Sequence, residues 1–162
     1  MSGIIGGAGS KSGIIGETEI DYEEGTFDPE YHMSGTDLTS VTYSTLNGGT
    51  YIKIGKMIHF QCYIRTNAIT KDSASGNIKI TGLPYVSIVD GTVEQRAGVA
   101  IGSAQNWADN APSSCYVGAG DSSLWPYNRT AIEGGTVAGA IGDLDTGSSK
   151  NILAIGGTYQ VD

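Results

Sequence analysis

The stretch from Tyr51 to Arg65, which reads YIKIGKMIHFQCYIR, decides the fold of this chain. From residue 57 onward, apolar and polar residues alternate. Successive side chains of a strand leave opposite faces of a sheet, so this period of two predicts a half-buried β-strand. Gly55 and Lys56 separate it from a shorter alternating run at 51–54, and a two-residue connection led by Gly predicts a β-hairpin. The side of the strand that we expect to be buried carries Ile58, Phe60, Cys62 and Ile64.

The rest of the chain continues this all-β pattern. Its 162 residues suit one domain. Gly accounts for 25 of these residues, a fraction well above the roughly 7% of average usage. No long run shows helical spacing. About eight or nine short strands, separated by Gly, Asn, Asp and Ser, predict an antiparallel jelly-roll-like β-sandwich. Pro126 predicts that its strand lies at an edge. The expected strands are 17–23, 51–54, 58–65, 77–81, 93–101, 115–119, 124–127, 136–141 and 151–161.

The charge and the hydropathy of the chain argue against two classes of partner. Nine basic residues face 17 acidic ones, giving a net charge of −8. Nucleic-acid binding depends on Lys and Arg that neutralise phosphates, so we expect no nucleic-acid partner. No apolar run approaches the ~18 residues of a membrane span, and no signal peptide is visible, so we expect synthesis in a cytoplasm and no membrane partner. Seven acids lie between residues 17 and 30, either as a solvated segment or facing a basic partner.

The first 16 residues repeat a short apolar motif, because SGIIG at 2–6 recurs at 12–16. Gly and Ser make such a segment flexible in isolation. It is either a disordered terminus or a peptide that becomes ordered on a partner, with its isoleucines in pockets. We therefore divide the chain into an N-terminal arm, 1–24, and a β-sandwich domain, 25–162. The expected anchor residues of the arm are Ile4, Ile5, Ile14 and Ile15.

The sequence shows no catalytic constellation. Cys62 and Cys115 lie in apolar strand-like runs, which predicts two buried thiols and no metal or redox chemistry. His59 lies on the polar side of its strand, facing solvent or an interface, and His32 receives no role. Nucleophile-elbow, HExxH and P-loop motifs are absent from the sequence. We therefore expect a protein that is not an enzyme and has no cofactor.

Three aspartates are the best candidates for a hard cation such as Ca²⁺, which prefers oxygen ligands. They are Asp121, Asp143 and Asp145, but their spacing lacks the Gly and Glu positions of an EF-hand loop. A pair of acids for glycoside cleavage would need a groove that the sequence does not reveal. We predict no metal site.

Aromatic residues gather in or beside the loops of residues 103–130, where Tyr116 accompanies two tryptophans and a second tyrosine. Exposed aromatic rings stack on sugar rings, but they also pack in cores and between subunits. Both readings stay open. The candidate glycan contacts are Trp107, Trp125 and Tyr127.

Several short motifs follow one another along the domain. They read GTFDP at 25–29, YIKIG at 51–55 with IHFQ at 58–61, SGNIKITGLPY at 75–85 and IGGTY at 155–159. In their order and spacing, these motifs resemble the terminal β-sandwich domains of bacteriophage fibres and related virion structural proteins. The resemblance covers most of residues 25–161.

The resemblance implies a jelly-roll-like sandwich that works as a homotrimer, used for attachment, decoration or display. Only about 24 residues precede the domain, whereas a fibre places a long shaft there. The first interpretation is therefore a trimeric capsid decoration protein or short head fibre in the virion, whose arm binds the major capsid protein or another virion protein. The alternative is a receptor-binding tip domain of a tail fibre that recognises host surface glycans. An enzyme acting on surface polysaccharide is the third reading.

Overall fold

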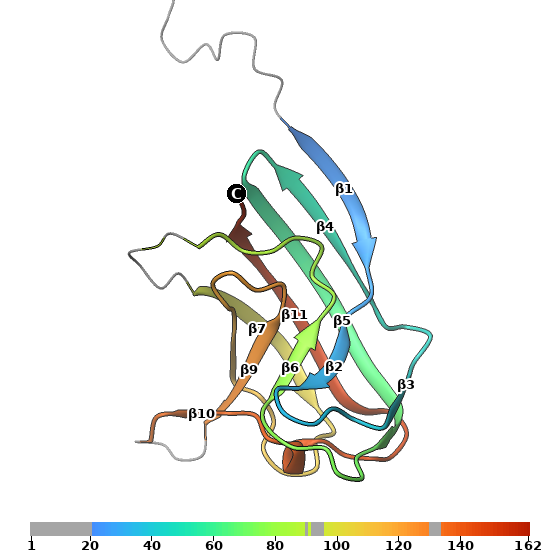
Figure 1. Ribbon diagram of the computed structural model, residues 1–162. Helices are drawn as coiled ribbons and strands as arrows, with labels where there is room; N and C mark the ends of the chain where they lie inside the picture. Colours follow the sequence, from blue (N-terminus) through green and yellow to red (C-terminus); the bar gives the residue numbers. More distant parts are fainter. Residues whose placement is uncertain (1–20, 90, 92–95, 130–133) are drawn as a thin grey trace, which may run out of the picture.

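The computed structural model describes residues 21–89, 91, 96–129 and 134–162. Over these residues the chain is all-β with antiparallel pairing, which confirms the predicted fold class (Figure 1). No helix in this part of the chain is long and apolar enough to cross a membrane. The elements are β1 (Tyr22–Phe27), β2 (Glu30–Met33), β3 (Ser40–Tyr43), β4 (Gly48–Ile54), β5 (Met57–Thr70), β6 (Ile78–Thr81), β7 (Ala97–Gln105), β8 (Ser114–Val117), β9 (Leu124–Arg129), β10 (Thr136–Ala138), the 3₁₀ turn η1 (Ile141–Asp143) and β11 (Lys150–Gln160).

The strands form one sheet that curls into two layers. Its order is β1-β4-β5-β11-β7-β8-β9-β6-β2, with β3 beside β5 and β10 beside β9. Strand β7 belongs to both layers, because residues 97–99 pair with β8 and residues 100–105 pair with β11. The register with β11 shifts beside Gly102, and such bulges increase the local twist. This bend lets β7 pass from one layer to the other.

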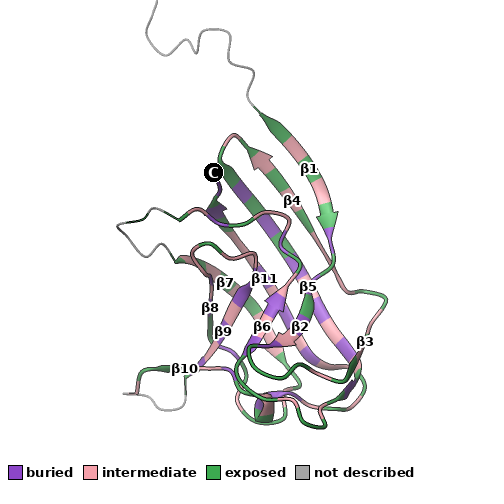
Figure 2. Cartoon of the chain, viewed as in Figure 1, coloured by how far each residue is buried: buried purple, intermediate pink, exposed green. Residues whose placement is uncertain are grey.

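The predicted hairpin is confirmed. Gly55 and Lys56 join β4 to β5, and Gly55 has the positive φ, 56°, that such a turn requires. The four side chains predicted to be buried are buried, whereas Met57, His59 and Gln61 on the opposite face are exposed (Figure 2). Strand β5 continues to residue 70, where we expected a loop from residue 66. The extension pairs with β3 and β11 and buries two further side chains, Thr66 and Ile69.

The core lies between the inner faces of the two layers. The predicted inner side of the last segment is confirmed, because Leu153, Ile155 and Tyr159 of β11 and Val161 just after it are all buried. The opposite layer contributes the inner side chains of β2, β6, β8 and β9, which are Tyr31, Met33, Ile78, Ile80, Cys115, Val117 and Leu124.

Both cysteines are buried and free, as predicted. Burial disfavours the thiolate and raises the pKa of Cys62 and of Cys115 to about 12. Since the thiolate is the reactive form, both thiols are inert at neutral pH.

The predicted edge position of the strand containing Pro126 is wrong, because β9 lies between β8 and β6. The Pro126 carbonyl accepts a hydrogen bond from the Gly139 amide (3.0 Å), so its nitrogen also points away from β8. On that side β6 pairs with β9 at a single position, Ile80 with Leu124. The missing N–H therefore costs no bond to β8, and the proline fits an interior strand.

Gly49 is a point of close approach inside the first layer. It lies between Phe27 of β1 and Cys62 of β5 in register. A Cβ added at Gly49 would lie 2.9 Å from the Cβ of Cys62 and closer still to the Phe27 ring. At the neighbouring Gly48, an added Cβ would meet nothing within 4 Å. The Phe27 ring thus occupies the space that a side chain at Gly49 would need.

We predict that Gly49→Ala destabilises the fold by ~1–3 kcal/mol, because the methyl group overpacks the core against Phe27. Gly48→Ala is the matched control, and we expect its urea midpoint to equal that of the wild type or to exceed it slightly. Urea unfolding followed by circular dichroism measures both variants. Equal midpoints for the two variants would contradict the role assigned to Gly49.

Candidate functional site

Two of the three candidate glycan contacts lie together on the outer face of the second layer. In β8 and β9 the buried and partly buried residues alternate, which turns Tyr116, Trp125 and Tyr127 outward. Tyr116 pairs directly with Trp125 across the two strands, and Tyr127 is the diagonal neighbour of Tyr116. These aromatic residues, which we call the aromatic face, come from the paired strands β8 and β9, where the sequence predicted strands at 115–119 and 124–127.

The aromatic face is ordered by its own contacts. The rings of Tyr116 and Tyr127 lie 5.4 Å apart at 39°, and their hydroxyl oxygens are 3.3 Å apart. The Trp125 indole N–H donates to the Asp121 carboxylate at 2.9 Å. The guanidinium of Arg96 lies 4.8 Å from the centroid of the Tyr116 ring, within the range of a cation–π contact. The arrangement is therefore a set of partly exposed rings bordered by polar groups.

Trp107, the third candidate, does not join this face. It packs edge-on against Tyr31 with ring centroids 5.9 Å apart, and its indole N–H donates to the carbonyl of Ile152 at 3.3 Å. Tyr31 is fully buried, so Trp107 caps one side of the core. The sequence grouped the two tryptophans by proximity in the chain, but which residues share a face follows from strand pairing.

A wide groove runs across the outer face of the first layer, formed by β1, β4, β5, β11 and β7. It consists of two adjoining hollows of about 750 and 610 Å³ that share Thr26, Thr50 and Gln61. Among the described residues that line the larger hollow, Asp28 is the single charged one. Its floor is made of small residues, which are Gly48, Ala100, Gly102, Ala154 and Gly156.

An apolar patch adjoins this groove. Register places Tyr22 of β1 beside Ile54 of β4, and Ile54 beside Met57 of β5, with Ile52 one step further along the same face. Each of these side chains exposes more than a third of its surface, and Ile54 exposes 53%. Contiguous exposed apolar side chains are typical of interaction sites. His59 lies on the same exposed face, as predicted, with Nδ1 3.0 Å from the Thr158 hydroxyl.

A cluster of polar side chains ties β1 to the loop after β6. The Glu23 carboxylate accepts hydrogen bonds from the hydroxyls of Tyr51 and Tyr85. These bonds lower the pKa of Glu23 and raise the pKa values of both tyrosines, because they stabilise the carboxylate and hold the phenols protonated. Lys53 pairs with Asp21 beside them. The cluster links β1 to β4 and to the loop after β6.

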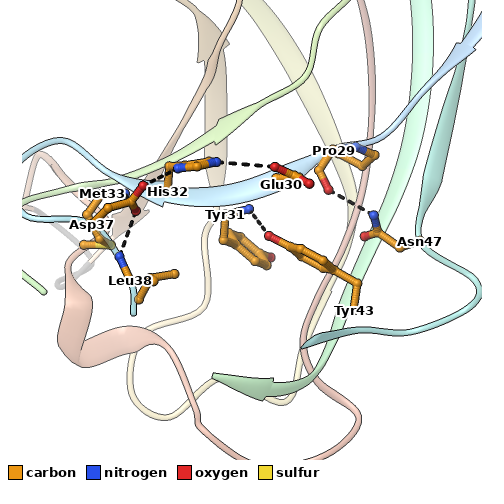
Figure 3. Close-up of polar contacts among 9 residues, drawn as sticks. All are labelled: Pro29, Glu30, Tyr31, His32, Met33, Asp37, Leu38, Tyr43 and Asn47. Atoms are coloured by element: carbon orange, nitrogen blue, oxygen red, sulfur yellow. Dashed lines mark hydrogen bonds and ion pairs between the residues drawn. The ribbon is translucent and has the colours of Figure 1, made fainter. Parts of the chain in front are cut away.

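His32, to which the sequence assigned no role, lies between two carboxylates on the edge strand β2 (Figure 3). Its Nδ1 contacts the Asp37 carboxylate, and its Nε2 lies 3.5 Å from Glu30. Partial burial by itself would raise the pKa of Asp37, but hydrogen bonds from His32 and two backbone amides lower it overall. One of those amides belongs to Met33 (3.0 Å).

The same cluster closes the free edge of β2. The Met33 amide donates to Asp37, and the Tyr31 amide donates to the Tyr43 hydroxyl at 2.6 Å (Figure 3). Both amides would otherwise be open to another strand. Side chains of the same chain therefore satisfy this edge, and such capping prevents edge-to-edge association.

The three aspartates considered for a cation are engaged separately. Asp121 accepts from Trp125, and Asp145 pairs with Lys150 at 2.9 Å. Asp143 accepts from the Asn128 amide at 2.6 Å and holds neighbouring loops. Among the residues that the structure describes, no group of three or more His, Cys, Asp or Glu side chains is placed to hold a metal ion.

The predicted anchor residues Ile4, Ile5, Ile14 and Ile15 lie outside the described residues. The predicted boundary between arm and domain, at residues 24 and 25, falls within β1, whose six residues all pair with β4.

Comparison with known proteins identifies a similar fold. No protein-family model and no curated protein matches the chain. The crystal structure of Dettilon tailspike protein is similar, with a TM-score of 0.61 and 19% sequence identity. The match covers 86% of this chain and 24% of the tailspike chain, so this chain spans about a quarter of that protein. At this identity, the similarity shows a shared fold.

We predict that the Glu23 cluster makes stability depend on acid pH. Because the pKa of Glu23 is lowered in the folded state, its contribution is present above the unfolded pKa of about 4.3 and is lost as the pH falls through the folded value. Glu23→Gln should therefore lower the melting temperature at about pH 7 and make little difference near pH 3. Glu24→Gln, on the exposed face of the same strand, is the control. A constant difference between Glu23→Gln and wild type across this range would contradict the prediction.

Proposed function

We propose that this chain is a structural domain of a bacteriophage virion that belongs to the adsorption apparatus, in a tail spike or fibre. The observation that carries the proposal is the likeness to Dettilon tailspike protein over 86% of this chain. The motifs GTFDP, YIKIG and GLPY along the same residues support it independently. Because the likeness covers 24% of that protein, the proposal concerns the role of a domain.

The role that fits this domain is binding, and we propose no catalytic activity for it. The carboxylates of Glu23, Asp37 and Asp143 are engaged in hydrogen bonds that hold strands and loops together. The polar groups of the aromatic face border partly exposed rings. Surfaces of this kind recognise a partner by contact area and a few hydrogen bonds.

We further propose that three copies associate through the outer groove and the apolar patch. With a net charge of −8, copies repel one another unless they meet through an uncharged face. The larger hollow is lined almost entirely by uncharged described residues, and the patch beside it exposes Tyr22, Ile54 and Met57. Burying such a patch is the main favourable term in subunit association.

Capsid decoration, the first interpretation of the sequence, is the second candidate. The observation that favours it is the repeated SGIIG motif at 2–6 and 12–16, which suits attachment of an arm to a repeating surface. Three arms on one trimer would gain affinity through effective concentration without a strong single contact. In that case the partners of the arm are the major capsid protein or another virion protein.

We expect antibody raised against the purified domain to label the tail region of intact virions in electron micrographs. The same antibody, as Fab, should reduce adsorption to host cells, because it covers the host-facing domain. Label on the head with unchanged adsorption would replace the spike assignment with decoration. Virions without label, under conditions where denatured virions react on a blot, would refute both candidates.

We expect the purified chain to have about three times its 16.8 kDa mass by light scattering. Ile54→Glu should shift it to monomer, because burying an unpaired carboxylate costs several kcal/mol, on the order of 3–5. The control is Val137→Glu, since Val137 is similarly exposed (48% against 53%) and lies on β10 of the other layer. A wild-type monomer at micromolar concentration would refute the trimer, and a trimeric Ile54→Glu variant would refute this contact face.

A further inference from the structure

The aromatic face is not required by the core of the protein. Its side chains lie opposite the buried residues of the same strands, since Cys115, Val117 and Leu124 point inward. Exposing the apolar rings of Tyr and Trp to water is unfavourable unless something covers them. Their hydroxyl and N–H groups favour a partner with polar atoms. The face thus combines apolar area with polar tips.

Open space lies next to these rings. Gly98 of β7 pairs directly with Tyr116, so the two residues share the outer face. A Cβ added at Gly98 would meet nothing within 4 Å. The absence of a side chain at Gly98 leaves space over β7, next to the Arg96 guanidinium that lies 4.8 Å from the centroid of the Tyr116 ring. A ligand that contacts the rings of Trp125 and Tyr127 can extend into this space.

We propose that the aromatic face binds a neutral hexopyranose unit of a glycan. The C–H face of a pyranose ring is apolar and packs on an aromatic ring, while its hydroxyls take hydrogen bonds at the rim. The Asp121 carboxylate, already held by the Trp125 N–H at 2.9 Å, and the hydroxyls of Tyr116 and Tyr127 supply acceptors and donors there. The site differs from the grouping expected from sequence, because it contains Tyr116 in place of Trp107.

The charge of the protein selects among ligands that stack on aromatic rings. At the face itself the Arg96 guanidinium and the Asp121 carboxylate carry opposite charges, so the net charge of −8 decides, and it disfavours nucleic acids and acidic polysaccharides. A neutral sugar carries no such penalty. The inference deepens the proposed adsorption role and rests on it for its biological setting, since a surface glycan of the host is the ligand that such a domain would meet.

The two tryptophans make the test selective. The chain contains two, so Trp107→Phe leaves Trp125 as the sole tryptophan, and its fluorescence reports on the aromatic face. We expect saturable changes when this variant is titrated with neutral oligosaccharides derived from dextran, mannan and galactan, with Kd between about 0.1 and 1 mM for at least one of them. The Trp125→Phe variant should show no fluorescence change. Calorimetric titration of the wild type gives the affinity without relying on either variant.

Gly98→Gln is the decisive variant, because it leaves every ring in place and fills the open space beside Tyr116. We expect it to weaken binding at least about tenfold, and Tyr127→Ala to do the same. Gly142→Gln is the control, since an added Cβ at Gly142 also meets nothing within 4 Å and Gly142 lies in η1, away from β8. Its affinity should equal that of the wild type.

Four results would overturn the proposal. The first two are the absence of a saturable signal with any neutral oligosaccharide at about 10 mM and equal affinity of Gly98→Gln and the wild type. The third is tighter binding of galacturonic-acid oligomers than of neutral ones. The fourth is a change in the oligomeric mass of Gly98→Gln, which would make the face a subunit contact. The virion labelling experiment is independent of all four. Labelled tails without sugar binding would refute this site alone, and sugar binding by a protein absent from virions would refute the proposed function alone.

Discussion

The two-faced pleat of β5 is the constraint on which the rest of this structure depends. Its inner side is dry, and the strand pairs with β3, β4 and β11, so three neighbours take their register from it. A shift of one residue would move Ile58, Phe60 and Ile64 into water and bring His59 and Gln61 inside. The cost of that exchange fixes the alignment of the first layer. The second layer then closes over the same buried row.

The outer edges of β1 and β2 are kept from pairing with another strand in two different ways. On β2, the Tyr43 hydroxyl and the Asp37 carboxylate take the free backbone amides. On β1, the acidic side chains of Glu23 and Glu24 make the approach of a further strand of the same acidic protein unfavourable. Association through the outer edges of β1 and β2 is therefore disfavoured.

The outer faces of the two layers offer different chemistry. The outer face of the first layer combines a wide, nearly uncharged groove with exposed Ile54 and Met57, which suits a contact between copies of an acidic chain. The outer face of the second layer carries aromatic rings with polar tips, which suits a small polar ligand. The two faces meet at β7, where Ala100 lines the groove and Gly98 lies beside Tyr116. The core does not depend on either occupant.

The sequence alone determined the all-β class, the hairpin at Gly55 and the inner sides of β5 and β11, because side-chain alternation and turn chemistry are local properties. It also indicated that both cysteines are buried. Only the tertiary structure decided that Pro126 lies in an interior strand, that Trp125 joins Tyr116 and Tyr127, and that Trp107 caps the core beside Tyr31. Each of these depends on which strands pair across long stretches of chain. That choice is set by the packing of both layers together, and periodicity within one segment carries no information about it.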